Sequence, residues 1–143
     1  MKVCKFGGSS VKDALQIKKI VNIIKSDEER KVIVVSAPGR DEIHNEKITD
    51  HLLNLATNGE HFESQKILIS TQESIEAIIK KFEKLCDDLK VDKKFIVEYL
   101  KKDLEDCKLK GDEKKAFYLS RGEHFNAKII TAYMNNIGVK TKL

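Results

Sequence analysis

The chain has 143 residues, which is room for one domain of ordinary size with a layered hydrophobic core. Hydrophobic residues make up 41% and charged residues 35% of it, a balance unlike that of a membrane-embedded protein or a disordered chain. The 27 basic and 23 acidic residues leave a net charge of only +4, and aromatic residues are 6% with no Trp. A strongly basic nucleic-acid-binding protein and a base-stacking surface are therefore not indicated.

The N-terminus and the cysteines favour a cytoplasmic location. Met1–Gly7 lacks the apolar stretch of a signal peptide, and the aliphatic run Val32–Val35 is far shorter than the roughly 20 residues that a membrane helix needs. Cys4, Cys86 and Cys107 are odd in number and widely spaced, so they indicate neither a disulfide framework nor a zinc site. We expect small buried or half-buried thiols in a reducing compartment.

Residues 1–40 predict a strand, a helix and a second strand. Lys2–Phe6 is a short strand that ends at a glycine pair. A helix is expected from about Ser10 to Lys25, capped by Ser9 or Ser10. Its apolar residues recur at a spacing of three to four: Val11, Ala14, Leu15, Ile17, Val21 and Ile24. Lys31–Val35 is almost entirely β-branched, which is typical of a parallel strand buried on both faces.

The remainder is predominantly helical in pattern. A polar loop is expected to about Glu46, followed by a helix over Ile48–Asn58. Two apolar stripes then predict helices, one through Ile75, Ile78, Ile79, Phe82, Leu85, Cys86 and Leu89, the other through Phe95, Ile96, Tyr99, Leu100 and Leu104.

A last helical segment is expected to begin near Asp112, to be interrupted at Gly122, and to stop at Gly138. Its apolar residues after the interruption are Phe125, Ile129, Tyr133 and Ile137. Val139–Leu143 then predicts a new strand, inside which the sequence stops.

This order of elements indicates an α/β layered fold that begins with a right-handed βαβ crossover. Two or three strands are too few to form a balanced sheet for so many helices. We therefore expect the first part of a longer domain.

The stretch from Lys5 to Ser10 joins the first strand to the first helix and suits phosphate. Glycines at 7 and 8 permit close approach of a ligand, the helix N-terminus offers free N–H groups, and Lys5 adds a positive charge. The order differs from the Walker A pattern, whose Lys follows the glycines. The alternative is an ordinary strand–helix turn with a surface lysine.

A second small-residue turn follows the second strand, at Ser36–Gly39. Because ligands bind at the carboxyl ends of parallel strands, both turns fall where a site is expected. Taken singly, Thr49 reads as a helix N-cap and Glu123 as a charge in the first turn of a helix.

The four histidines show neither metal-ligand spacing nor a catalytic set; they are His44, His51, His61 and His124. No metal ligand is therefore predicted among these residues.

Four segments in order resemble the aspartokinases of the amino acid kinase family. Lys5-Phe6-Gly7-Gly8-Ser9-Ser10 is similar to their opening motif, and Val34–Ala37 to their second strand and turn. Ile48–Leu53 resembles their Thr-Asp helix start, and Leu119–Glu123 their Ser-x-Gly-Glu element. The first motif distinguishes aspartokinases from relatives that phosphorylate glutamate, acetylglutamate or uridylate.

The resemblance implies an αβα sandwich of the amino acid kinase type and a reaction. Aspartokinases transfer the γ-phosphoryl of MgATP to the β-carboxylate of L-aspartate, which opens the route to lysine, threonine and methionine. By motif, Lys5 would be catalytic and neutralise the phosphoryl group, with Phe6, Gly7, Gly8 and Ser9 in the same ATP phosphate loop. Ser36, Thr49 and Glu123 would bind aspartate, Glu123 through its ammonium group.

The resemblance also implies that parts of the kinase lie outside these residues. Residues 1–143 would be the N-terminal, aspartate-side part of the kinase domain, without the nucleotide-binding half and the regulatory ACT domains. Arg40–Lys47 is longer than in some members, which indicates a subgroup difference or a mobile loop. We expect a fragment that is inactive alone, from a parent that is a homo-oligomer and uses ATP and Mg²⁺.

Two other interpretations stay open. One is a kinase of the same fold with another acid substrate. The other is a non-catalytic helical module that binds a partner protein through the amphipathic stretch from about Ser64 to Lys110. Size-exclusion chromatography distinguishes the helical module from a kinase fragment. A module should elute as a monomer or a defined dimer, whereas a fragment would self-associate through unpaired strand edges.

Overall fold

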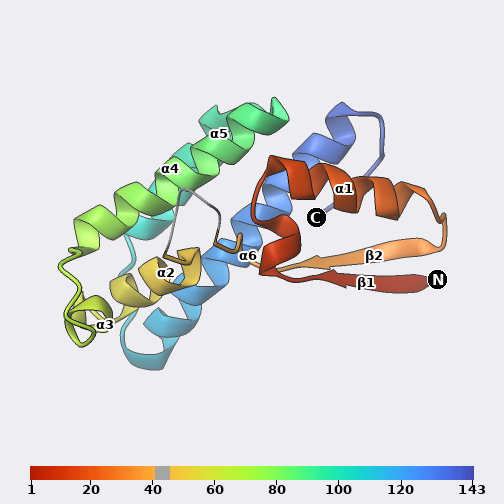
Figure 1. Cartoon of the computed structure of the whole chain (residues 1–143). Helices are drawn as coiled ribbons and strands as arrows, with labels where there is room; N and C mark the ends of the chain where they lie inside the picture. The colour runs from red at the N-terminus through yellow and green to blue at the C-terminus, as the bar shows by residue number, and fades with distance from the viewer. Residues whose placement is uncertain (41–45) are drawn as a thin grey trace.

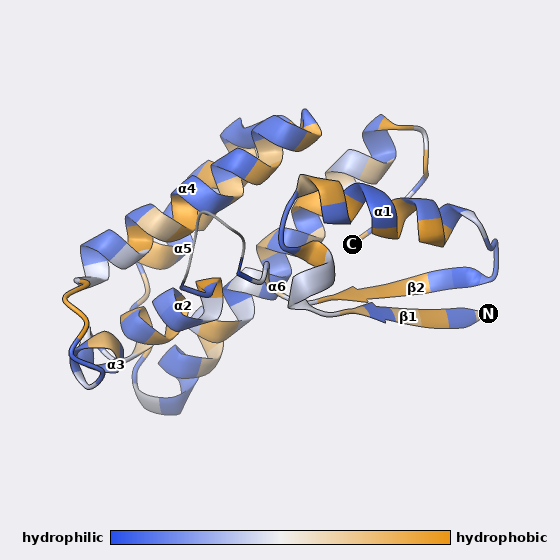
Figure 2. Ribbon diagram, in the orientation of Figure 1, coloured by the Kyte–Doolittle hydropathy of each residue, from blue (hydrophilic) through white to orange (hydrophobic). Residues whose placement is uncertain are grey.

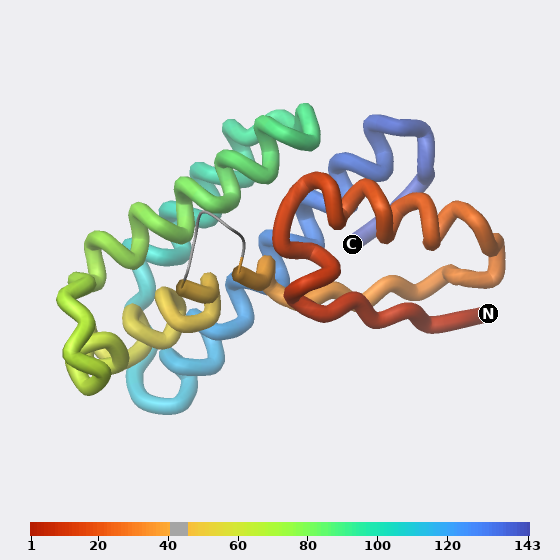
Figure 3. The backbone as a smooth tube through the Cα atoms, viewed as in Figure 1, coloured from red at the N-terminus to blue at the C-terminus, as the bar shows by residue number. Residues whose placement is uncertain are grey.

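A small parallel sheet and a group of helices lie side by side, and one long helix runs along both (Figures 1 and 3). The computed structural model describes residues 1–40 and 46–143. Most of the expected loop Arg40–Lys47, including His44, therefore lies outside the described residues. Within the described residues, no helix combines the length and the hydrophobicity that crossing a membrane requires.

The predicted strand–helix–strand unit is confirmed. Strand β1 (Lys2–Phe6) pairs in parallel with β2 (Arg30–Val35), and α1 (Ala14–Lys25) connects them. In the pairing, Cys4 lies opposite Ile33 and Phe6 opposite Val35. The carboxyl ends of both strands therefore meet at one edge of the sheet.

The start of α1 differs from the prediction. Ser9 and Ser10 belong to a separate 3₁₀ turn, η1 (Gly8–Val11), and do not cap α1. Asp13 is the N-cap, and its carboxylate accepts a hydrogen bond from the Gln16 N–H at 2.8 Å. Leu15 is 62% exposed because it lies off the apolar face of α1, whose buried residues are Ala14, Ile17, Ile20, Val21 and Ile24.

The prediction that β2 is buried on both faces is wrong. Val32 and Val34 are 41% and 44% exposed, whereas Ile33 and Val35 pack against the hydrophobic core. Among the described residues the helices cover only this second face. The segment Val139–Leu143 forms no strand; its last residues lie beside β2, where they line a small cavity of about 100 Å³.

Between β2 and the last helix, the described part of the chain forms α2 (Ile48–Ala56), α3 (Glu60–Glu63), α4 (Thr71–Leu89) and α5 (Lys93–Glu105). The apolar stripe predicted for α4 is confirmed, since Phe82 and its neighbours on that face are buried. On α5 only Leu100 and Leu104 are buried, while Phe95 and Tyr99 are 64% and 58% exposed. Figure 2 shows the resulting alternation of apolar and polar faces along these helices.

A buried polar cluster fixes α2 against α3 and α4. The Asn54 amide donates to the Ser74 hydroxyl at 3.0 Å and to the Ile69 carbonyl at 3.2 Å, and its oxygen accepts from the Phe62 N–H at 3.2 Å. The His51 Nδ1 lies 3.2 Å from the same Ser74 hydroxyl. Because buried polar groups are costly when unpaired, these bonds specify one orientation for α2.

Helix α6 (Gly111–Asn136) is continuous, so the predicted break at Gly122 is wrong. A Cβ at Gly122 would lie 2.7 Å from the Ala37 Cβ and 3.2 Å from the Leu52 Cδ1. The glycine is there because α6 passes very close to the turn after β2 and to α2. The predicted stop near Gly138 is confirmed, with α6 ending at Asn136.

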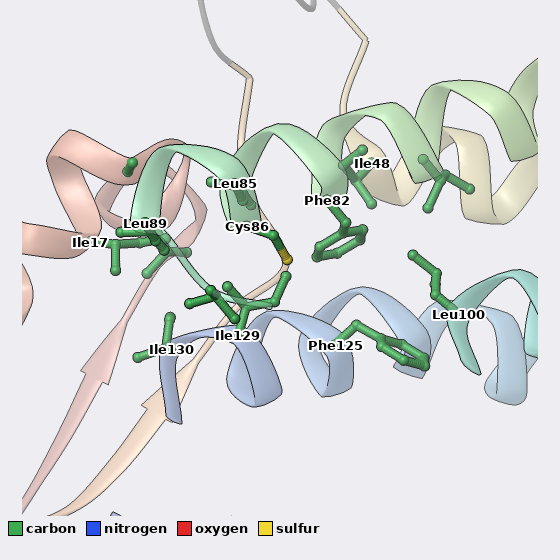
Figure 4. Packing of buried hydrophobic residues seen from close by; sticks show 14 of the residues in the cluster. Ile17, Ile48, Phe82, Leu85, Cys86, Leu89, Leu100, Phe125, Ile129 and Ile130 are labelled. Carbon is green, nitrogen blue, oxygen red and sulfur yellow. The ribbon is translucent and has the colours of Figure 1, made fainter. Parts of the chain in front are cut away.

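The hydrophobic core lies between α4 and α6 and continues under α1 (Figure 4). Phe82, Phe125 and Ile129 from these two helices are at most 1% exposed. Ile17 of α1 and Leu89 of α4 extend the cluster toward the sheet. The predicted helix-rich α/β class is therefore confirmed, with one helical layer on one face of a small sheet.

Replacing Gly122 with Ala should lower the free energy of unfolding by about 1–3 kcal/mol, because the added methyl group overlaps Ala37. At an open helical position the same change would stabilise by about 1 kcal/mol. Urea unfolding followed by circular dichroism measures the difference. Gly7→Ala is the matched control, since no atom lies within 4 Å of its Cβ position. An unchanged or raised stability for Gly122→Ala would contradict the close approach of α6.

The three cysteines should differ in reactivity. Cys86 is fully buried, and burial together with the nearby Asp87 raises the pKa of its thiol to about 11. Cys4 and Cys107 are free and half-buried. At pH 7.5 a thiol reagent should modify two groups in the native chain and the third only after unfolding. Cys86→Ala should remove only the slow group; three fast thiols would refute this packing.

Candidate active site

The two turns predicted at the sheet edge are joined by backbone hydrogen bonds. The Ser36 N–H donates to the Phe6 carbonyl at 3.0 Å, which continues the β1–β2 pairing by one step. The Gly39 N–H then donates to the Gly8 carbonyl at 2.9 Å. The turn after β2 is thereby held directly against the turn after β1.

This contact requires glycine at position 39. A Cβ there would lie 2.7 Å from the carbonyl carbon and 2.8 Å from the carbonyl oxygen of Gly8, closer than real Cβ atoms approach. A Cβ at Gly8 would meet the Ala37 carbonyl oxygen at 3.3 Å. Gly7 has open space around it, so that side of the loop is accessible to a ligand.

A pocket of about 550 Å³ opens beside the joined turns. Its walls come from η1, the turn after β2, the start of α2 and the middle of α6. Five of the residues that the sequence analysis selected line it: Gly8, Ser9, Ser36, Thr49 and Glu123. Residues more than a hundred positions apart in the sequence therefore share one cavity, although their roles stay predictions.

The other three selected residues do not line this pocket. Lys5 is exposed and shares the uncovered face of the sheet with Val34, its partner in the strand pairing. Phe6 is half-buried on the opposite face. Gly7 is the N-cap of η1 and is exposed. All three lie at the carboxyl end of β1, next to the pocket residue Gly8.

Thr49 reaches the pocket from the first turn of α2. Lys47 is the N-cap of that helix, so the reading of Thr49 as the cap is wrong. The Asp50 carboxylate accepts a hydrogen bond from the Lys47 N–H at 3.4 Å and holds the helix start in place. Since Asp50 does this work, the exposed Thr49 side chain is available to a ligand.

Glu123 and Ser36 come from α6 and the end of β2. Glu123 lies midway along α6, not in a first turn, because α6 continues through Gly122. One turn further on, the Asn126 amide donates to the Ser36 carbonyl at 2.8 Å and is fully buried. The Asn126 side-chain oxygen has no hydrogen-bond partner among the described residues. The sequence analysis missed Asn126; its spacing of four from Gly122 on a continuous helix is the signal.

Two cations in the pocket were also missed. Arg40 follows the turn after β2, and Lys47 precedes α2. Both are exposed. Within 1–40 and 46–143, the charged heads of Arg40, Lys47 and Glu123 form no ion pair. Their position at the two ends of the expected loop is the sequence signal that could have selected them.

His124 does not add charge at this place. Burial lowers the pKa of its imidazole, and the nearby cations Lys128 and Arg121 act in the same direction. Its ring meets Phe125 edge to face, with centroids 5.3 Å apart. The imidazole is therefore mostly neutral at pH 7.

No cluster of three His, Cys, Asp or Glu side chains that could hold a metal ion occurs in the described part of the chain. The pocket therefore offers backbone amides, hydroxyls, two cations and one carboxylate. Such a set suits a ligand that carries both an ammonium group and anionic groups.

Sequence comparison relates the whole chain to known proteins. Residues 1–143 match the sequence model of the amino acid kinase family. Aspartokinase 3 of Bacillus subtilis (strain 168) is 36% identical over 147 residues, which cover 99% of this chain and 31% of that protein. The chain therefore spans less than a third of the length of this relative.

Comparison with solved structures also finds aspartokinases. The aspartate kinase of Clostridium acetobutylicum superposes with a TM-score of 0.72 and 32% identity over 93% of this chain and 29% of that chain. Escherichia coli aspartokinase III in complex with aspartate and ADP superposes with a TM-score of 0.68 at 21% identity over 94% of this chain and 29% of that chain, a likeness of fold. On the match over its whole length, this chain belongs to the amino acid kinase family.

Proposed function

We propose that residues 1–143 are the aspartate-side part of an aspartokinase domain. The complete enzyme would transfer the γ-phosphoryl of MgATP to the β-carboxylate of L-aspartate, giving β-aspartyl phosphate, the first step toward lysine, threonine and methionine. The observation that carries the proposal is the single pocket that joins Gly8 and Ser9 to Ser36, Thr49 and Glu123.

The relatives support this substrate pair. The Bacillus and Clostridium proteins are aspartokinases, and the Escherichia coli structure holds aspartate and ADP. A pocket lined both by a glycine turn and by the Glu123 carboxylate, which forms no ion pair with another described residue, suits a phosphorylated donor and an amino acid acceptor together.

The turn after β1 would hold the phosphates. Gly7 is open to approach, and the N–H groups of Gly8 and Ser9 lie in the first turn of η1. Phe6 anchors the end of β1 in the core below this loop. Lys5 would place its ammonium near the transferring phosphoryl group, whose charge it would neutralise.

The opposite wall would hold the acceptor. Glu123 would bind the ammonium group of aspartate, and Thr49 would form a hydrogen bond with the aspartate. Ser36 would line the site from the end of β2. Asn126 would keep Ser36 in place through its bond to the Ser36 carbonyl.

The chemistry needs no general base. A β-carboxylate oxygen of aspartate forms a bond to the γ-phosphorus of ATP, the bond from that phosphorus to the β,γ-bridging oxygen breaks, and ADP leaves with the electron pair. The acceptor carboxylate is already ionised at neutral pH, so the reaction does not require a His–Asp pair as general base. Mg²⁺ would arrive with ATP, since the described residues offer no ligand set for it.

We further propose that the nucleotide-binding half and the regulatory ACT domains lie outside residues 1–143. The chain alone would then bind part of the substrates but not turn them over. The complete protein would be a cytoplasmic homo-oligomer that binds neither nucleic acid nor membrane. The three free cysteines suit the reducing conditions of the cytoplasm.

The complete product of the reading frame should form hydroxamate when given L-aspartate, MgATP and hydroxylamine, because hydroxylamine traps an acyl phosphate. Lys5→Ala should lower kcat at least about 100-fold, since it removes the charge next to the transferred group. The 143-residue chain should give no signal.

Lys19→Gln, an exposed change on α1, is the matched control and should keep full activity. No hydroxamate from a folded, complete product would exclude the aspartokinase assignment and favour another acid substrate. Turnover by residues 1–143 alone would show that the active site ends earlier in the chain than proposed.

Glu123→Gln should raise KM for L-aspartate about tenfold or more, because the amide keeps the shape of the side chain but loses the charge that pairs with the ammonium group. KM for ATP should stay the same. Steady-state kinetics with each substrate varied in turn measures both values. A rise in the KM for ATP alone would contradict the placement of Glu123 at the acceptor.

A further inference from the structure

The pocket contains more charge than the family motifs account for. Glu123 supplies one negative charge, while Arg40 and Lys47 supply two positive charges on the same lining. The described residues of the lining therefore carry a formal charge of +1. An amino acid with a carboxylate side chain has a net charge of −1 near neutral pH, whereas a neutral amino acid has none.

Both cations are attached to backbone that the fold holds in place. Arg40 directly follows Gly39, whose N–H bonds to the Gly8 carbonyl at 2.9 Å. Lys47 is the N-cap of α2, fixed by its N–H bond to Asp50. They flank residues 41–46 in the sequence and line one cavity.

Some surface cations of the chain are already paired with a carboxylate. Lys2, Lys84 and Lys93 each lie within 3.1 Å of a carboxylate oxygen. Arg40 and Lys47 form no ion pair within the described residues, although Glu123 lines the same pocket. Positive charge is therefore left available on the wall that also presents Thr49.

We propose that Arg40 and Lys47 bind the carboxylates of the acceptor and select acidic over neutral amino acids. The inference rests on the proposed function and deepens it. Arg40 supplies a planar pair of N–H donors that matches a carboxylate, and Lys47 supplies a point charge. The N-terminus of α2, beside Lys47, adds its positive dipole end to the same wall.

The position of the cations favours the acceptor over the nucleotide. Arg40 and Lys47 share the pocket with the three acceptor residues Ser36, Thr49 and Glu123. Of the phosphate loop, Gly8 and Ser9 also line the pocket, whereas Lys5, Phe6 and Gly7 do not. A phosphate group is the other anion that these side chains could bind, so the test must separate the two sources.

The test measures kinetics of the complete product of the reading frame with Arg40→Gln, Lys47→Gln and the double variant. Each single change should raise KM for L-aspartate about tenfold, and KM for ATP should stay the same. Inhibition by L-asparagine, which has the same shape with one carboxylate fewer, should weaken less than the binding of L-aspartate. The preference for L-aspartate over L-asparagine should thus fall several-fold, up to about tenfold where L-asparagine binding is unchanged.

Two controls keep the result interpretable. Lys19→Gln removes an exposed charge outside the pocket and should change neither KM. Arg40→Lys and Lys47→Arg keep the charge and should recover most of the selectivity. Arg40 and Lys47 are exposed, so thermal unfolding of the variants should match that of the original protein.

Three outcomes would overturn the inference. If the variants bind L-aspartate and L-asparagine equally more weakly, or bind both as well as the original protein does, the cations do not bind the second carboxylate. A rise confined to the KM for ATP would assign them to a phosphate group. If the unsubstituted protein forms no acyl phosphate from any acidic amino acid, the proposed function fails together with this inference. If the unsubstituted protein is active and the variants keep its KM for L-aspartate, only the inference fails.

Discussion

The hydrogen bond from the Gly39 N–H to the Gly8 carbonyl is the contact on which the site depends. It joins the two loops at the carboxyl ends of β1 and β2, which parallel pairing brings to one edge but does not by itself hold together. At 2.9 Å the two backbones touch, and a side chain at position 39 would occupy the space of the Gly8 carbonyl. Beyond the last step of the strand pairing, this contact is the bond that holds the loop of Ser9 against the loop of Ser36.

Helix α6 extends the same principle of close backbone approach to a third element. Gly122 lets the helix pass next to Ala37, one residue beyond Ser36. One turn later, Asn126 bonds the Ser36 carbonyl from a fully buried position. Glu123, which follows Gly122 directly, is thereby presented beside the joined loops. A single stretch of α6 thus both packs against the turn and supplies the carboxylate of the pocket.

The sequence predicted these elements well where local chemistry decides them, as in β1, β2, α4 and the convergence of both glycine turns on one edge. It failed where tertiary contact overrides local preference. Gly122 has the lowest helix propensity after Pro, so it read as a break, whereas close packing against Ala37 keeps it inside α6. Strand β2 read as buried on both faces from its β-branched residues, but burial depends on which layers are present. Asn126, Arg40 and Lys47 were missed because they belong to the site only through the pocket, which segments distant in the sequence form together.

The composition of the pocket also explains why the motifs alone do not define a ligand. Gly8, Ser9 and Ser36 offer neutral hydrogen-bonding groups, which suit phosphate, carboxylate or water alike. Charge separates these possibilities: a single carboxylate at Glu123 calls for an ammonium group, and the two cations on the neighbouring wall call for more than one anionic group. Under the proposed function, substrate choice by this chain would depend on the residues that flank the motifs, at the end of β2 and the beginning of α2, as well as on the motifs themselves.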